Sequence, residues 1–179
     1  MSEALNVAVC QINPTLGNFQ KNIDIISKNY KSAVEKGADL VVFPEMSITG
    51  YPPQDLLNNK EFISQNISCL NELVKSITIP CILGYVDFED NKKFNAAAVC
   101  QDGEIVYKYH KIHLPNYDVF DERRYFHSGD SIGIFDLKVN NSDYKIALQI
   151  CEDLWEDEYE RNISGEIIKN KPDLIINIS

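Results

Sequence analysis

The sequence lacks the features that define several large classes of protein. No apolar segment approaches the roughly 20 residues of a membrane-spanning helix. The N-terminus, MSEALNVAVCQINP, has neither the basic region nor the long apolar stretch of a signal peptide. The net charge is −10 and no basic patch dominates, which argues against a nucleic-acid partner. We therefore expect a cytoplasmic protein with no membrane or nucleic-acid partner.

The five cysteines show no CxxC spacing and lie in or beside apolar runs, at Cys10, Cys69, Cys81, Cys100 and Cys151. An odd number placed in this way is typical of reduced intracellular thiols and not of a disulfide framework. With 179 residues, 44% of them hydrophobic and 25% charged, the chain fits one globular domain.

The remaining pattern predicts an α/β fold. Buried strands at 6–12 and 39–43 flank a helix at 18–36, which makes a βαβ unit with parallel strands. Long loops are expected at 44–58 and 110–130. The other predicted elements are a helix at 61–76, strands at 79–87, 94–101 and 104–109, strands at 132–139 and 144–150, a helix at 155–170 and a buried parallel strand at 173–178. Turns are predicted at Glu89–Lys92, Asp102–Gly103 and Asn140–Asn141. Because parallel strands are usually followed by a covering element, a chain that stops at the tip of such a strand is expected to be part of a longer protein.

Three chemically useful side chains each follow a predicted strand, namely Glu45, Lys111 and Cys151. In α/β sheets such residues gather at the strand ends, where they can share one crevice. The acids Glu152 and Asp153 directly follow the cysteine and should suppress its thiolate. A nucleophilic role therefore needs the charge of Lys111, the base Glu45 and the positive end of a helix after Cys151. The alternatives are a core cysteine, a loop glutamate and a solvated lysine.

Evidence for a metal or phosphate site is weak. His110 and His113 have i, i+3 spacing, but Asp118 is their single nearby carboxylate, so no metal is predicted. Gly129 and Gly133 form no phosphate loop, and neither GxxxxGK[ST] nor GxGxxG occurs.

Three motifs in order, FPEMSITGYPPQDLL, YHKIHLPNYDVFDERRYF and QICEDLW, resemble the nitrilase (carbon–nitrogen hydrolase) superfamily. TGYPPQDLL and LPNYDVFDERRYF narrow the resemblance to the N-terminal glutaminase domain of glutamine-dependent NAD+ synthetases. The resemblance runs through the whole chain. It implies a nitrilase-type α-β-β-α sandwich, with residues 1–179 forming a partial carbon–nitrogen hydrolase domain that is incomplete at the C-terminus and lacks the ATP-dependent synthetase domain.

The resemblance also implies residue roles. Cys151 matches the nucleophile, Glu45 the general base, Lys111 the lysine that stabilises the tetrahedral intermediate, and Glu122 a second glutamate that orders the lysine and substrate. The implied substrate-binding residues are Tyr117, Ser179, Tyr51 and Glu152. The backbone N–H of Glu152 is expected to assist Lys111 in holding the oxyanion.

The implied reaction is hydrolysis of the glutamine side-chain amide. In the full-length enzymes the ammonia passes to a synthetase domain that uses ATP and Mg2+ to amidate deamido-NAD+, whereas this domain itself needs no cofactor. A homo-oligomer is also implied. The alternatives are a stand-alone nitrilase-family amidase, against which TGYPPQDLL argues, and a non-catalytic truncated remnant or subunit.

Overall fold

The computed structural model describes residues 4–155 and 159–179. A five-stranded sheet has the order β1-β2-β3-β4-β5, and a three-stranded sheet has the order β6-β7-β8. Strands β1 to β3 are parallel to one another, β3 to β5 are antiparallel, and β7 is antiparallel to β6 but parallel to β8. Their bounds are β1 Val7–Val9, β2 Leu40–Val42, β3 Cys81–Glu89, β4 Lys92–Gln101, β5 Glu104–His110, β6 Gly133–Val139, β7 Ser142–Ile150 and β8 Leu174–Ile178.

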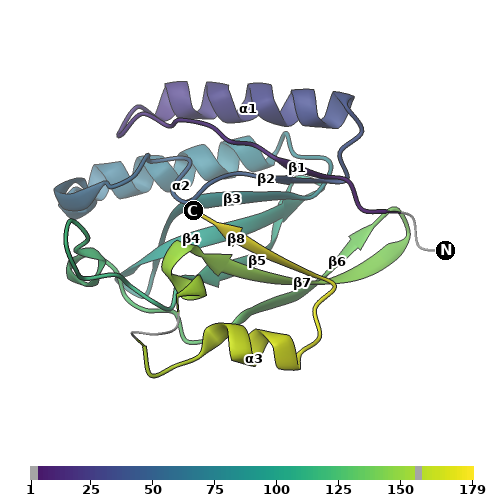
Figure 1. The fold of residues 1–179 in the computed structure, drawn as a ribbon. Helices are drawn as coiled ribbons and strands as arrows, with labels where there is room; N and C mark the ends of the chain where they lie inside the picture. The colour runs from purple at the N-terminus through teal and green to yellow at the C-terminus, as the bar shows by residue number, and fades with distance from the viewer. Residues whose placement is uncertain (1–3, 156–158) are drawn as a thin grey trace.

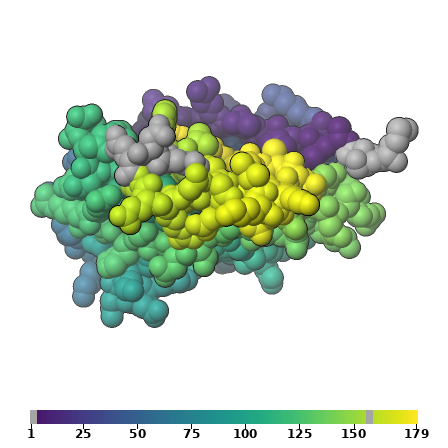
Figure 2. Space-filling model, turned by 60° about the horizontal axis from the view of Figure 1, so that its bottom comes forward, coloured from purple at the N-terminus to yellow at the C-terminus, as the bar shows by residue number. Residues whose placement is uncertain are grey.

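The layers follow the order helix, sheet, sheet, helix (Figure 1). Helices α1 (Phe19–Glu35) and α2 (Lys60–Val74) lie on the outer side of the five-stranded sheet, and α3 (Ile163–Lys169) lies on the outer side of the other sheet. From the side of α3, the C-terminal residues cross the middle of the molecule in yellow, below the purple N-terminal segment (Figure 2). The predicted α-β-β-α sandwich is confirmed. None of the helices in the described part of the chain is long and apolar enough to cross a membrane.

The central strands β2, β3 and β4 of the five-stranded sheet are mainly buried, which explains why they read as nearly continuous apolar runs. On β4, Ala96, Ala98 and Cys100 join the core beneath α1 and α2. Ala97 and Val99 join the core between the two sheets. The polar Asn95 is fully buried on this strand.

The predicted turns are confirmed by their backbone angles. Asp90 and Asn91, Asp102 and Gly103, and Asn140 and Asn141 all have positive φ. These pairs connect β3 to β4, β4 to β5 and β6 to β7. Two consecutive positive φ values suit the right-handed twist of a hairpin, and Asn, Asp and Gly adopt them at least cost.

The prediction that β1 is buried is wrong. Val7 and Val9 are 36% and 77% exposed. Their parallel partners Leu40 and Val42 are buried in the core between the sheets. Coverage by the second sheet therefore stops between β2 and β1. Strand β8 pairs in parallel with β7 as predicted, but it is only partly buried.

The predicted helix at 155–170 is also largely wrong. A four-residue 3-10 helix runs over Cys151–Leu154, and Trp155 is extended and two-thirds exposed. Residues 156–158 lie outside the described residues. Helix α3 begins later because the Asn162 side chain caps it by accepting a hydrogen bond from the backbone N–H of Gly165.

Candidate active site at the strand ends

The structure brings Glu45, Lys111 and Cys151 together from three strand ends. Glu45 follows β2, Lys111 follows β5 and Cys151 follows β7. Lys111 Nζ donates to Glu45 Oε1 at 2.8 Å. The charges of Glu45 and Lys111 both act on the Cys151 thiol. The site thus lies where the ends of the two packed sheets meet.

Lys111 binds a second carboxylate as well. Its Nζ donates to Glu122 Oε1 at 3.0 Å, and the hydroxyl of Tyr51 donates to the same oxygen at 3.0 Å. Lys111, Glu45 and Glu122 are all buried. Burial alone lowers the pKa of Lys111, but attraction to Glu45 and Glu122 outweighs it and raises that pKa. The lysine therefore remains an ammonium ion.

The pKa of Glu122 is raised, whereas the pKa of an ordinary ion-paired acid is lowered. Burial raises its pKa, the Lys111 charge lowers it and the Glu45 charge raises it, so the net shift is upward. Two carboxylates share one ammonium ion here, and neither is well solvated. The cluster therefore carries an excess of negative potential close to the thiol.

The pKa of Cys151 is raised, first by burial and then by the charge of Glu45. The Ser179 side chain and the charge of Lys111 act in the opposite direction. The sequence analysis attributes suppression of the thiolate to Glu152 and Asp153. In the structure, burial and the charge of Glu45 are the main causes of the raised Cys151 pKa. The resting thiol is thus protonated at neutral pH, next to a carboxylate that can accept its proton.

Glu152 and Asp153 are both engaged elsewhere. The Tyr117 hydroxyl lies 3.1 and 3.0 Å from the two oxygens of Glu152, and the Tyr159 hydroxyl donates to Oε1 at 3.0 Å. The ring of Tyr159 stacks on His113 with centroids 3.8 Å apart. Tyr117 and Glu152, both predicted substrate-binding residues, therefore lie together on the side of the site near Cys151.

Asp153 joins the segment that follows β5 to the end of β7. Its Oδ1 accepts from the backbone N–H groups of Ile112 and His113 at 3.0 and 2.8 Å. Its Oδ2 accepts from the Tyr109 hydroxyl at 2.8 Å and from the Ile150 N–H at 3.0 Å. This fully buried carboxylate fixes the segment after Lys111 against the end of β7. The sequence analysis missed this role, although an acid directly after a strand-end cysteine was visible.

Gly84 on β3 makes room for Glu45, and the sequence analysis missed it too. A Cβ atom at Gly84 would overlap the Pro44 carbonyl oxygen and would lie 2.7 Å from the Glu45 Cα. The Ser47 hydroxyl donates to the Gly84 carbonyl at 3.0 Å. Only glycine allows the Glu45 backbone to pass this close to the sheet.

Two site loops contain non-glycine residues with positive φ. Cys151 has φ +44° and Met46, directly after Glu45, has φ +48°. Such conformations are sparsely populated for residues with a side chain and cluster at functional sites. The expected helix dipole at Cys151 is reduced to a single 3-10 turn, so it contributes little to the thiol.

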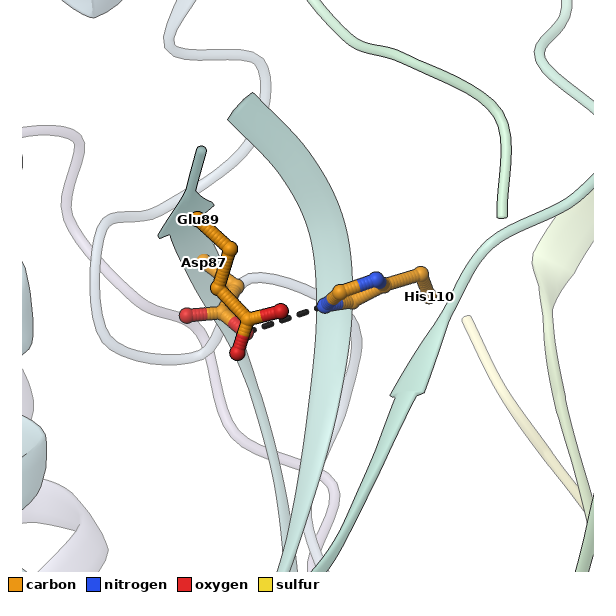
Figure 3. Close-up of side chains that lie close together, drawn as sticks. All are labelled: Asp87, Glu89 and His110. Atoms are coloured by element: carbon orange, nitrogen blue, oxygen red, sulfur yellow. Dashed lines mark hydrogen bonds and ion pairs between the residues drawn. The ribbon is translucent and has the colours of Figure 1, made fainter. Parts of the chain in front are cut away.

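Two acids and a histidine form a second group of side chains (Figure 3). Asp87, Glu89 and His110 place their ligand atoms within 4.8 Å of one another. Lys108 Nζ already lies 3.0 Å from Asp87 and 2.8 Å from Glu89, so a lysine occupies the position of a cation. His113 stacks on Tyr159 instead, so the two histidines considered as metal ligands do not share a site.

Cavity size does not mark the candidate active site. A hollow of about 660 Å3 lies beside α2 and shares no residue with the Lys111 cluster. A small cavity of about 30 Å3 is lined by Tyr51, Phe120 and Glu122. The chemistry of the clustered side chains, and not volume, identifies the site.

Comparisons with known proteins identify the family of the chain. The chain is 41% identical over 154 residues to a glutamine-dependent NAD(+) synthetase of Thermotoga maritima, covering 84% of this chain and 26% of that protein. It is 36% identical to the corresponding protein of Synechocystis, covering 97% of this chain and 33% of the relative. The chain thus spans about a quarter to a third of the length of these relatives.

Among solved structures, a glutamine-dependent NAD+ synthetase from Acinetobacter baumannii in complex with ADP matches with a TM-score of 0.88 and 30% identity. The match covers 97% of this chain and 32% of that one. An amidase from Nesterenkonia shares the fold, with a TM-score of 0.79 at 20% identity over 97% of this chain and 66% of its own. The carbon-nitrogen hydrolase family profile matches residues 6–168. The chain therefore belongs to the carbon–nitrogen hydrolase family.

Proposed function

We propose that this chain is the glutaminase portion of a glutamine-dependent NAD+ synthetase and hydrolyses the side-chain amide of glutamine. The observation that carries the proposal is the buried cluster in which Lys111 binds Glu45 and Glu122 beside the Cys151 thiol. The names of the relatives with 36–41% identity support glutamine as the substrate.

In the first step, the Cys151 sulfur attacks the amide carbon of glutamine while Glu45 accepts the thiol proton. Because the resting thiol is protonated, a base in contact with the site is needed for the attack. The amide oxygen becomes an oxyanion. Lys111 stabilises it as a permanently charged ammonium ion in a buried site, where charge stabilisation is strong.

In the second step, the C–N bond breaks and Glu45 returns its proton to the departing ammonia. The acyl group remains on Cys151 as a thioester. Glu45, again a carboxylate, then takes a proton from water as the water attacks the thioester. The C–S bond then breaks, glutamate leaves, and Glu45 returns the proton to the Cys151 sulfur, so the thiol is restored and Glu45 is again a carboxylate.

Substrate recognition is assigned to Glu152, Tyr117, Ser179 and Tyr51. Glu152 is a buried carboxylate whose described partners are two neutral tyrosine hydroxyls. An uncompensated carboxylate suits the α-ammonium group of glutamine. Tyr51 donates its hydroxyl to Glu122, so it orders the lysine cluster as well as lining the pocket.

The activity of the whole protein is part of the proposal. Ammonia from this site would feed a domain that uses ATP and Mg2+ to amidate deamido-NAD+, and the assembled protein would be a homo-oligomer. The glutaminase domain itself would need no metal or cofactor. All five cysteines are unpaired, which supports a cytoplasmic location.

The competing proposal is a stand-alone amidase, which the shared fold with the Nesterenkonia protein keeps open. The two proposals differ in the acyl group that Cys151 accepts. A glutamine-like electrophile, 6-diazo-5-oxo-norleucine, should give one covalent adduct on Cys151 in the mass spectrum of the full-length protein. Labelling by simple aliphatic amide analogues, with no labelling by the glutamine analogue, would favour the amidase.

The first variant to test is Cys151→Ala in the full-length protein. It should abolish glutamine hydrolysis, because no other group forms the thioester, while NAD+ formation from added ammonia continues. Cys69→Ala, at a half-buried cysteine on α2, serves as the control and should keep both activities. Glutamine hydrolysis that persists in folded Cys151→Ala would refute the assignment.

A further inference from the structure

Asn95 stands in contact with both carboxylates of the Lys111 cluster. It lies on β4, fully buried, and its Nδ2 donates to Glu45 Oε1 at 2.5 Å. The same Nδ2 lies 3.4 Å from Glu122 Oε2. Its backbone carbonyl accepts the N–H of Lys111 at 2.9 Å. One residue therefore touches Glu45, Lys111 and Glu122.

The charges of the cluster explain why a neutral amide is suited to this position. Glu45 and Glu122 together carry two negative charges against the single positive charge of Lys111. A second cation would compete with the ammonium ion for the oxyanion of the intermediate. A neutral N–H donor holds both carboxylates without adding charge, and hydrogen bonds to ionised groups are stronger than those between neutral groups.

The arrangement also distinguishes the two oxygens of Glu45. Among the described residues, Asn95 Nδ2 and Lys111 Nζ both donate to Oε1. Two donors on one oxygen fix the rotation of the carboxylate. They leave Oε2 as the oxygen that can take up and return a proton.

Asn66 shows how a purely structural buried asparagine differs. It is equally buried, and both ends of its amide pair with the backbone of Val86: Nδ2 donates to the carbonyl and Oδ1 accepts the N–H. In Asn95, Oδ1 has no hydrogen-bond partner among the described residues. An unpaired buried acceptor is costly, and its retention calls for an explanation.

We infer that Asn95 is a positioning residue that holds the Glu45 carboxylate through Oε1 and reserves Oε2 for proton transfer in amide hydrolysis. This inference rests on the proposed function, because it gives Glu45 the role of the base. It assigns Asn95 no contact with substrate.

The test compares Asn95→Ala, Asn95→Asp and the control Asn66→Ala in the full-length protein. Asn95→Ala should lower kcat for glutamine hydrolysis about 10- to 100-fold, the loss expected for one hydrogen bond to a charged group, with little change in KM. The acid limb of the kcat profile should change as well, because Asn95 Nδ2 no longer donates to Glu45 Oε1. Asn66→Ala should lower the Tm and leave the pH profile unchanged.

Asn95→Asp sharpens the test because it keeps the shape of the side chain. At neutral pH it adds a third carboxylate and should be less active than Asn95→Ala. At acid pH the introduced carboxyl group is protonated and offers an O–H donor, so the ratio of the two activities should reverse. The inference would be overturned if Asn95→Ala kept kcat within twofold and an unchanged acid limb. It would also be overturned if the ratio of the activities of Asn95→Asp and Asn95→Ala did not depend on pH.

Failure of the proposed function can be told apart from failure of this inference. If the wild-type protein does not hydrolyse glutamine, the proposed function fails, and Asn95 is judged by alkylation of Cys151 with iodoacetamide. Asn95→Ala should shift the midpoint of that reaction to higher pH, because the Glu45 charge acting on the thiol is no longer shared with an N–H donor. An unchanged midpoint would overturn the inference.

Discussion

The chain contains two clusters with nearly the same chemical groups and different physical properties. In one, Lys111 binds Glu45 and Glu122, and all three side chains are at most 6% exposed. In the other, Lys108 binds Asp87 and Glu89, and the lysine and Glu89 side chains are 38% and 51% exposed. The two lysines are only three residues apart in the sequence.

The comparison teaches that the neighbouring groups, and not burial alone, set the pKa of each carboxylate, because the Asp87 side chain is only 3% exposed. Burial alone would raise the pKa of Asp87, but hydrogen bonds with His110 and Lys108 lower it to about 2. Glu122 also pairs with a lysine, yet burial and the nearby Glu45 charge raise its pKa. Asp87 therefore has its own lysine and histidine partners, whereas Glu45 and Glu122 share one buried lysine beside Cys151.

The largest difference should appear when each lysine is removed. Lys111→Met leaves two buried carboxylates without a counter-ion, a change that typically costs about 3–5 kcal/mol of stability. It should also reduce glutamine hydrolysis by about 100- to 1000-fold, as expected when an oxyanion donor is lost. Urea unfolding and steady-state kinetics measure the two effects.

Lys108→Met is the matched control. A partly exposed ion pair usually contributes about 1 kcal/mol or less, so this variant should fold and retain its activity. Equal losses of activity in the two lysine variants would remove the distinction between the clusters.

A smaller difference should appear between the variants Glu122→Gln and Glu89→Gln. The glutamine at 122 can still accept a hydrogen bond from Lys111, but it weakens the attraction that raises the pKa of the lysine. Its amide N–H2 also meets the donor of Asn95 in place of an acceptor. We expect about a 10-fold loss in kcat for Glu122→Gln, the size of one hydrogen bond to a charged group, and none for Glu89→Gln. The comparison would fail if Glu89→Gln were the more damaging change.

The smallest difference should be visible in the pH dependence of stability. The pKa of Asp87 is about 2 in the folded state, below its ordinary value of 3.8. Its ion pairs therefore stabilise the fold above about pH 4, and this contribution is lost as the pH falls toward 2. Asp87→Asn should flatten the unfolding free energy over this range.

Glu122 should show the opposite sign. Because its folded-state pKa is raised, the unfolded state releases this proton first, and the linked contribution to stability falls as the pH rises above the ordinary glutamate pKa. Unfolding free energies of Glu122→Gln across mildly acidic pH should therefore decline less with rising pH than those of the unsubstituted chain. Identical slopes would contradict the upward shift.

The sequence predicted the convergence of the strand-end residues well, for a physical reason. Apolar runs that stop at a polar residue place that residue at the rim of a sheet, as with Glu45, Lys111 and Cys151. Consecutive Asn, Asp and Gly residues located the three hairpin turns equally well. Strand ends and tight turns are determined by a few consecutive residues, so they can be predicted without knowledge of the tertiary packing.

The remaining features depend on packing that local patterns do not contain. Asn95 lies inside a predicted strand, and only the alignment of β4 with the loops after β2 and β5 places its amide between Glu45 and Glu122. The need for glycine at position 84 likewise depends on which backbone crosses it. The exposure of β1 depends on how far the second sheet extends, which no feature of residues 6–12 records.

The hydrogen bonds of the Asp153 carboxylate have a consequence for the order of folding. These hydrogen bonds join the end of β7 to the segment after β5, across 40 and 41 residues of sequence and between the two sheets. Glu45 and Lys111 are 66 residues apart. Contacts between residues so distant in the chain form after local hairpins, because more chain entropy must be lost to close the loop. The hairpins β3–β4, β4–β5 and β6–β7 can thus form first, and the surroundings of Cys151 become complete only when the two sheets pack together.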